Sequence, residues 1–114
     1  GIRQTEYTRK NGEQKENNMI KIIAIHQVKA DKVEEFIRMA TPLVDATRKK
    51  DKGCIRYELV QDVKNPQNLT MLEEWEDQDS IQAHMSSTHF KEITTATADL
   101  LEKAPEILIC KTVL

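Results

Sequence analysis

Residues 20–28 constrain the fold of this chain more than any other segment. They read IKIIAIHQV, a run rich in β-branched residues that is typical of a β-strand. Side chains alternate between the two faces of a strand. One face here carries Ile20, Ile22, Ala24, His26 and Val28, and the other carries Ile23 and Ile25. Because both faces hold apolar residues, the sheet that contains this strand must be covered on both sides.

An amphipathic helix is predicted to follow this strand. Asp31 is the expected N-cap, with Glu34 three residues later as the second half of a capping box. Apolar residues then recur at spacings of three and four between residues 33 and 47, which is the helical period. Pro42 lies inside this pattern and predicts either a kink or a division of the helix. Gly53, which follows a cluster of basic residues, is the natural end of this segment.

The rest of the chain predicts three more strands and two short helices. The expected elements are strands at 54–63 and 69–76, helices capped by Asp77 and Ser87, and a last strand at 106–114. Asn65-Pro66 marks the turn between the first two of these strands, which should pair antiparallel. The resulting order, β-α-β-β-α-β, belongs to the α+β class and is the ferredoxin-like arrangement.

The sheet face away from the helices is predicted to be apolar as well. Its expected residues are Ile23, Ile25, Leu59, Leu72, Ile107, Ile109 and Val113. Two such sheets pressed together would bury these rows as one interior. The sequence therefore predicts a homodimer joined through its sheet faces.

The composition fits one folded domain and excludes several partners. Hydrophobic residues make up 39% of the chain and charged residues 32%, which is typical of globular proteins. A net charge of −2 offers no basic surface for nucleic acid, and no apolar run is long enough to predict a membrane span. Residues 1–18 are mostly polar and predict an N-terminal extension before a domain at 19–114. The two cysteines, Cys54 and Cys110, give no disulfide framework, which favours a cytoplasmic protein.

The side chains best suited to a binding cavity are concentrated in residues 72–90. This stretch holds the chain's single tryptophan, Trp75, and two of its three histidines, His84 and His89. Trp75 lies near the end of a predicted strand and His84 on the helix that follows. If that helix folds back over the sheet, the indole and the imidazole can line one cavity. The pattern alone is equally compatible with Trp75 as ordinary core and His84 as a structural helix residue.

Residues 19–114 resemble the antibiotic biosynthesis monooxygenase family, and most of all its quinol-monooxygenase-type members, which are dimeric α/β barrels. The resemblance rests on IIAI at 22–25, GCIRY at 53–57, LEEWE at 72–76, AHM at 83–85 and HF at 89–90. The order and spacing of the last three motifs identify the family better than they identify a substrate, because one scaffold can carry several reactions.

The resemblance implies oxygenation of a small aromatic such as a quinol by O₂, with no metal, flavin or haem. Triplet oxygen does not insert directly into a singlet arene, but an arene anion can give it one electron. The protein must therefore deprotonate a phenol with a pKa of roughly 10 and shield the radical pair from water. His84 is predicted to be the base. Glu73 shares the strand face of Trp75 and could orient a histidine.

Four residues are predicted to contact the substrate. Trp75 offers a face for stacking, Phe90 and His89 begin the next helix, and His26 lies on the row of Ala24. His89 also fits a structural role at the helix start. No metal site is predicted, because the spacing of the histidines does not ensure that their side chains converge.

Two other functions are left open by these residues. Residues 28–37 are also similar to the branch of the family that isomerises a phosphorylated autoinducer sugar, for which Lys29, Arg56 and Lys91 could supply cations. Trp75 favours an aromatic ligand over a sugar phosphate. A non-catalytic stress-response barrel is the third reading. Thr94 stands where haem-degrading relatives place their iron ligand, which argues against haem.

Overall fold

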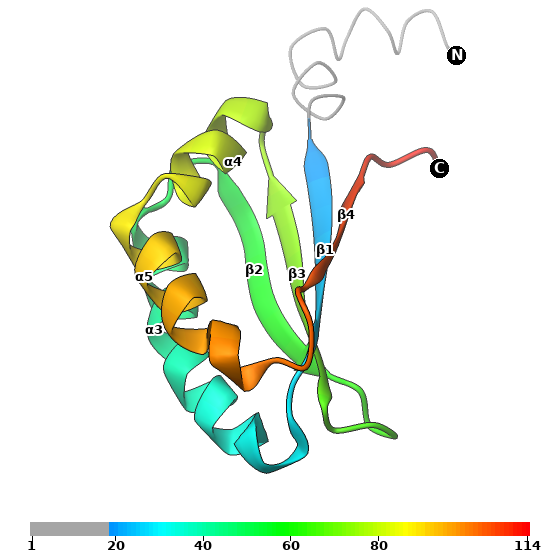
Figure 1. The fold of residues 1–114 in the computed structure, drawn as a ribbon. Coiled ribbons are helices and arrows are strands. Elements are labelled where there is room, and N and C mark those ends of the chain that lie inside the picture. The colour runs from blue at the N-terminus through cyan, green and yellow to red at the C-terminus, as the bar shows by residue number, and fades with distance from the viewer. Residues whose placement is uncertain (1–18) are drawn as a thin grey trace, which may run out of the picture.

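Four strands form one antiparallel sheet, and the helices of the described residues all lie against one of its faces (Figure 1). This arrangement is seen in a computed structural model that describes residues 19–114; the predicted extension 1–18 lies outside the described residues. The elements are β1 (Ile20–Gln27), the 3₁₀ turn η1 (Ala30–Lys32), α3 (Val33–Lys50), β2 (Cys54–Gln61), β3 (Asn68–Trp75), α4 (Gln78–Met85), α5 (Thr88–Thr97), the 3₁₀ turn η2 (Ala98–Leu100) and β4 (Glu106–Cys110). The predicted ferredoxin-like α+β order is confirmed. Strands β2 and β4 end earlier than predicted, at Gln61 and Cys110.

The pairing register decides which residues face the helices. The strand order is β2-β3-β1-β4, so β1 lies between β3 and β4. Ile23 pairs with Leu72 on β3 and with Leu108 on β4. Since directly opposed residues point to the same side, these three share the open face with Ile25. The buried residues Ile22 and Ala24 face the helices.

Three residues predicted on the open face lie on the helix side instead. Ile109 pairs with Ile22 and Ile107 pairs with Ala24, so both share the face of these buried partners. They are nevertheless exposed, at 66% and 52%, because β4 is an edge strand. Leu59 packs against the core beneath the helices. Side chains change face with every residue, so Leu108 takes the place on the open face that Ile107 and Ile109 were predicted to hold.

The core between helices and sheet has two parts. The part beside α4 contains Ile22, Ala24, Leu43, Tyr57, Met71, Trp75 and Ile81. The part beside η1 contains Val28, Phe36, Ala40, Leu69 and Leu100. Trp75 is fully buried, at 0% exposure, as a tryptophan at the centre of a small core should be.

The start and the middle of α3 differ from the sequence predictions. Asp31 does not cap the helix, since it lies inside η1, and Lys32 precedes α3 without a side-chain cap. Pro42 does not divide α3, which runs unbroken from Val33 to Lys50. The helix presents its buried residues to the sheet on both sides of the proline, and that packing outweighs the backbone hydrogen bond that proline cannot make.

None of the helices in the described part of the chain is long and apolar enough to span a lipid bilayer.

Candidate functional site

The imidazole of His84 lies in a cage of aromatic rings. Asp77 caps α4 by accepting a hydrogen bond from the Ser80 N–H, as predicted, and α4 then carries His84 back over the end of the sheet. The ring centroid of His84 lies 4.7 Å from that of Trp75, 4.8 Å from Phe90 and 5.2 Å from Tyr57. The histidine is 2% exposed. The structure thus brings together the indole and imidazole that the sequence placed on consecutive elements.

Asp51 orients this imidazole, and the sequence analysis missed it. Oδ2 of Asp51 lies 2.6 Å from Nδ1 of His84. A carboxylate only accepts, so the proton of the neutral ring sits on Nδ1 and the lone pair on Nε2. Nε2 is buried and has no hydrogen-bond partner among the described residues. The Asp51–His84 pair therefore leaves the lone pair of Nε2 inside the aromatic cage, where it can accept a proton.

The backbone around Gly53 fixes Asp51 in this position. Asp51 is the C-cap of α3, and its N–H bonds to the Thr47 carbonyl. Gly53 has a φ of 84°, and its carbonyl accepts from the N–H of Glu76. A Cβ at this glycine would lie 2.0 Å from Oγ of Ser80, in the cap of α4. Only glycine lets the end of α3 approach the start of α4 this closely.

A local signal for Asp51 was present in the sequence. The last turn of α3 holds Arg48, Lys49 and Lys50, which suit the negative end of the helix dipole. An aspartate directly after them opposes that dipole, so it needs a compensating partner. Glu73 was predicted to orient a histidine; in the structure its carboxylate accepts from Trp75, and Asp51 is the carboxylate on His84.

His89 is the second imidazole on Asp51. Its Nε2 lies 2.9 Å from Oδ1 and 3.0 Å from Oδ2 of the carboxylate. Ser87 holds the two histidines in register, because its hydroxyl donates to the His84 carbonyl at 2.6 Å and accepts from the Phe90 N–H as the cap of α5. The prediction that Ser87 caps this helix is confirmed. Asp51, His84 and His89 therefore converge, which the spacing of the histidines did not lead us to expect.

Glu73 lies beneath the cage as a nearly buried carboxyl. Its Oε1 accepts the Trp75 Nε1–H at 2.8 Å and fixes the indole. Burial raises the pKa of Glu73 to about 7, an effect that the bond to Trp75 partly opposes. Tyr57 pairs with Glu73 across the strands, and burial together with this carboxylate raises the pKa of the phenol well above its usual range.

The same desolvation keeps His84 neutral. Burial lowers its pKa below the ordinary value, and Asp51 offsets part of that shift. A histidine with a lowered pKa is unprotonated at neutral pH and can accept a proton. Burial also raises the pKa of the Cys54 thiol to about 11, so this cysteine stays protonated and unreactive at neutral pH.

His26, the third histidine, lies in a different part of the domain. It pairs with Leu69, whereas Ile20 at the other end of β1 pairs with Trp75. Six residues of strand separate the two positions by about 20 Å. Nδ1 of His26 contacts the Leu69 carbonyl at 3.2 Å, and the ring packs against Phe36. The structure does not bring this predicted substrate contact to the cage.

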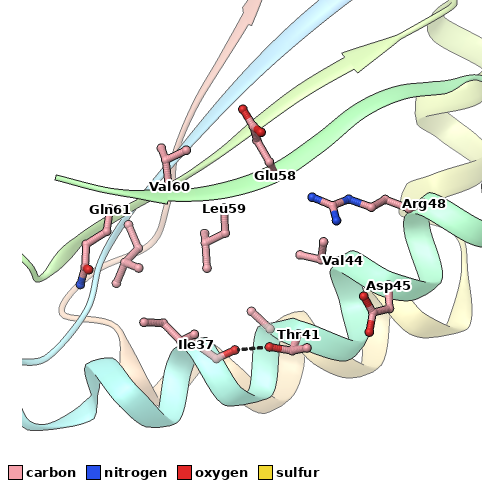
Figure 2. A pocket seen from close by; sticks show the side chains of 11 residues that line it. Ile37, Thr41, Val44, Asp45, Arg48, Glu58, Leu59, Val60 and Gln61 are labelled. Atoms are coloured by element: carbon pink, nitrogen blue, oxygen red, sulfur yellow. Dashed lines mark hydrogen bonds between the residues drawn. The ribbon is translucent and has the colours of Figure 1, made fainter. Parts of the chain in front are cut away.

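A groove opens between α3 and the edge strand β2 (Figure 2). It has a volume of about 560 Å³, and its lining includes Ile37, Val44 and Leu59. The Leu59 side chain points toward α3, and those of Glu58 and Val60 point away. Arg48 lies at one end of the groove and its Nε donates to the Tyr57 carbonyl at 2.9 Å. Arg48 thus lines the groove and bonds to the backbone of Tyr57, whose ring belongs to the cage.

The fold and this site define a ferredoxin-like α+β domain with a histidine–tryptophan site between sheet and helices. Residues 19–96 match the antibiotic biosynthesis monooxygenase family, and the chain belongs to that family.

Three relatives illustrate the range of similarity. A conserved protein from Methanosarcina mazei Go1 is 40% identical, with a TM-score of 0.83 over 89% of this chain and 99% of its own. YcnE of Bacillus subtilis (strain 168), named provisionally as a monooxygenase, is 30% identical over 79% of this chain and 94% of its own length. The protein sll1783 of Synechocystis (strain PCC 6803) is 32% identical over 75% of this chain, which spans 57% of that relative.

Proposed function

We propose that this protein is a cofactor-independent monooxygenase that oxidises a small quinol-type aromatic with O₂. The observation that carries the proposal is the Asp51–His84 pair: Nε2 of His84 has no hydrogen-bond partner among residues 19–114, and the ring lies against aromatic side chains. Family membership supports oxygenation in general, and the quinol rests on the resemblance to quinol-monooxygenase-type members together with the aromatic surroundings of His84.

In the proposed reaction His84 takes a phenolic proton on Nε2 while Asp51 holds the proton on Nδ1. The imidazolium formed is stabilised by the carboxylate 2.6 Å away. The quinol anion then gives one electron to O₂, and the radical pair combines at the ring carbon. One oxygen atom enters the ring and the other leaves as water, so the quinol supplies all the electrons and becomes a hydroxyquinone.

The cage must admit the substrate ring beside Trp75. Phe90, at the start of α5, is the least buried ring of the cage, whereas Trp75 and Tyr57 are at 0% and 3% exposure. We therefore place the entry at Phe90, whose displacement would open the face of Trp75. Closure of the rings over the bound quinol would exclude water from the radical pair.

The test is oxygen consumption with menadiol or dihydroxynaphthalene after exhaustive treatment of the protein with EDTA. Turnover should persist without added metal or flavin. Because quinols also react slowly with oxygen unaided, the reference is the His84→Ala protein at the same concentration. Loss of turnover after chelation would point to a metal and contradict the mechanism.

The isomerase alternative loses one of the three cations named for it. Arg56 was the candidate on β2, but it lies across the sheet from the helices and is 3.4 Å from Glu74. A phosphate group beside His84 could not reach this guanidinium. The aromatic cage favours a flat, uncharged ring.

We also propose that the protein is a homodimer joined by the open sheet face. This face carries Ile23, Ile25, Val60, Leu72 and Leu108, and no helix of the described residues lies over them (Figure 1). A contiguous apolar face of this kind is a common protein–protein contact, and a second copy of the same face is its natural complement. Paired charges border it at one end, where Lys21 and Arg56 both approach Glu74.

Light scattering of the wild type at micromolar concentration should give twice the chain mass of 13.2 kDa. Leu72→Lys should shift this mass to that of one chain, since a charge would be buried at the centre of the interface. Val63→Lys is the matched control, because Val63 is 95% exposed in the loop between β2 and β3. A wild-type protein that scatters as a single chain would rule out this assembly.

A further inference from the structure

We propose that Asp51, His84 and His89 also bind a divalent transition-metal ion such as Zn²⁺, and that the bound ion removes the base of the proposed reaction. The binding itself is independent of that reaction. Only the inhibitory consequence rests on the proposed function.

The ligand atoms already converge. Nδ1 of His84, Nε2 of His89 and the Asp51 carboxylate all lie within 4.8 Å of one another. The two nitrogens are 2.6 Å and 2.9 Å from the carboxylate oxygens. Zinc bonds of about 2.0–2.2 Å in tetrahedral geometry separate neighbouring ligand atoms by about 3.3 Å. To admit the ion, the two hydrogen-bonded pairs would widen by about 0.7 Å or less, and the two nitrogens, which lie within 4.8 Å of each other, would move to the same separation.

The chemistry of the ligands fits a borderline transition metal. Two imidazoles and one carboxylate are a combination that suits Zn²⁺ and its neighbours, whereas Mg²⁺ and Ca²⁺ prefer oxygen ligands alone. Three protein ligands leave a fourth position for water. His89 is 18% exposed at its side chain, so the ion can reach the cluster from solvent on that side.

The ligands are held in place before any ion arrives. Asp51 is fixed as the C-cap of α3, and Ser87 ties the end of α4 to the start of α5. Binding would therefore cost little side-chain or backbone ordering. The ion would replace the two hydrogen bonds that Asp51 makes to His84 and His89. The carboxylate and the two ring nitrogens that form these hydrogen bonds would then bind the metal.

The metal ion and the substrate proton would bind opposite nitrogens of the His84 ring. A metal on Nδ1 of His84 moves the proton of the neutral ring to Nε2, with no net release. Nε2 then carries an N–H in the cage formed by Trp75, Tyr57 and Phe90. The negative face of an aromatic ring attracts an N–H and repels a lone pair, so the cage suits this tautomer. The metal-bound ring has no lone pair left for a phenolic proton, so occupancy and catalysis exclude each other.

The experiment is a calorimetric titration of the EDTA-treated full chain with ZnCl₂ at neutral pH. One ion per chain is expected. His89→Ala should raise the dissociation constant for Zn²⁺ by about 100-fold or more, since the loss of a residue that only supports a metal ligand already lowers metal affinity about 10–100-fold. His26→Ala is the matched control and should bind like the wild type, because this histidine lies at the far end of β1. Equal affinity of the wild type and His89→Ala, or no binding to the wild type, would overturn the site.

Two further measurements keep the result interpretable. Zn²⁺ should raise the melting temperature of the wild type but not that of His89→Ala, and the melting curve of this variant also shows whether it is folded. Co²⁺ used as a probe should give visible bands of low coordination number without a thiolate charge-transfer band. A thiolate charge-transfer band would assign the ion to Cys54 or Cys110 and contradict the proposal.

The inhibitory effect has its own readout. Zn²⁺ should abolish oxygen consumption with menadiol, and EDTA should restore it. Inhibition that persists in His89→Ala would overturn the regulatory part. If the protein proves to have no quinol turnover, the proposed function fails, while calorimetry and Co²⁺ spectra still decide the metal site.

Discussion

His84→Ala is expected to lower quinol turnover by about 100-fold or more, the usual contribution of a positioned general base. The side chain is 2% exposed and its only hydrogen bond, among the contacts of the described residues, is to Asp51. Removing it takes away the lone pair inside the cage. Alanine is a better helix former than histidine, so α4 itself should persist.

The pH dependence of this loss separates chemistry from packing. The deficit of His84→Ala should shrink as the pH approaches the quinol pKa of roughly 10, because the substrate then ionises unaided. A purely structural defect would not recover in this way. Gln82→Ala, an exposed position on the same helix, is the control for the helix and should keep wild-type turnover. A His84→Ala enzyme that is fully active at neutral pH would leave this residue as lining only.

Asp51→Asn is a useful companion to this variant. The amide oxygen can still accept the Nδ1–H, but it no longer stabilises the imidazolium by charge. We expect a smaller loss of turnover than for His84→Ala.

Glu73→Gln is expected to stabilise the protein above neutral pH by up to about 3 kcal/mol. The pKa of Glu73 is raised from 4.5 to about 7 in the folded protein. The folded state therefore binds the proton more tightly than the unfolded state. The stabilisation from the protonated carboxyl is fully present below 4.5 and is lost as the pH rises through about 7. Glutamine cannot ionise, yet it keeps an oxygen that accepts the Trp75 Nε1–H.

Denaturant unfolding at about pH 5 and about pH 8 measures this difference. The protein concentration is held fixed, since dimerisation would shift the midpoint. The wild type should lose stability between the two values and Glu73→Gln should lose much less. Glu92→Gln, on the exposed side of α5, should follow the wild type. If Glu73→Gln and the wild type show the same pH dependence, the carboxyl of Glu73 is not the group that titrates.

Two of the three predicted helix caps agree with the structure. Asp77 and Ser87 cap their helices through hydrogen bonds to a backbone N–H three residues further on, so the local sequence contains all the groups involved. Asp31 was read by the same rule and does not cap α3. A 3₁₀ turn precedes that helix, and its start is set by the exit from β1 as well as by local residues.

The face of β4 depended on pairing and could not be found from alternation alone. Ile107 and Ile109 alternate correctly, but their face is set by the residues opposite them on β1. A shift of one residue in the pairing register moves every side chain of a strand to the other face of the sheet. The residues of the open face are therefore a property of the assembled sheet.

The sequence by itself determined the order of the elements, the family, and the presence of Trp75 and His84 on consecutive elements near one end of the sheet. These follow from periodicity, caps and motifs that span a few residues. The tertiary structure alone decided that Asp51, 33 residues before His84, orients its ring, that His89 shares this carboxylate, and that Glu73 binds Trp75 instead of a histidine. These contacts depend on how closely the end of α3 packs on the start of α4, a distance that no local pattern encodes and that Gly53 makes possible.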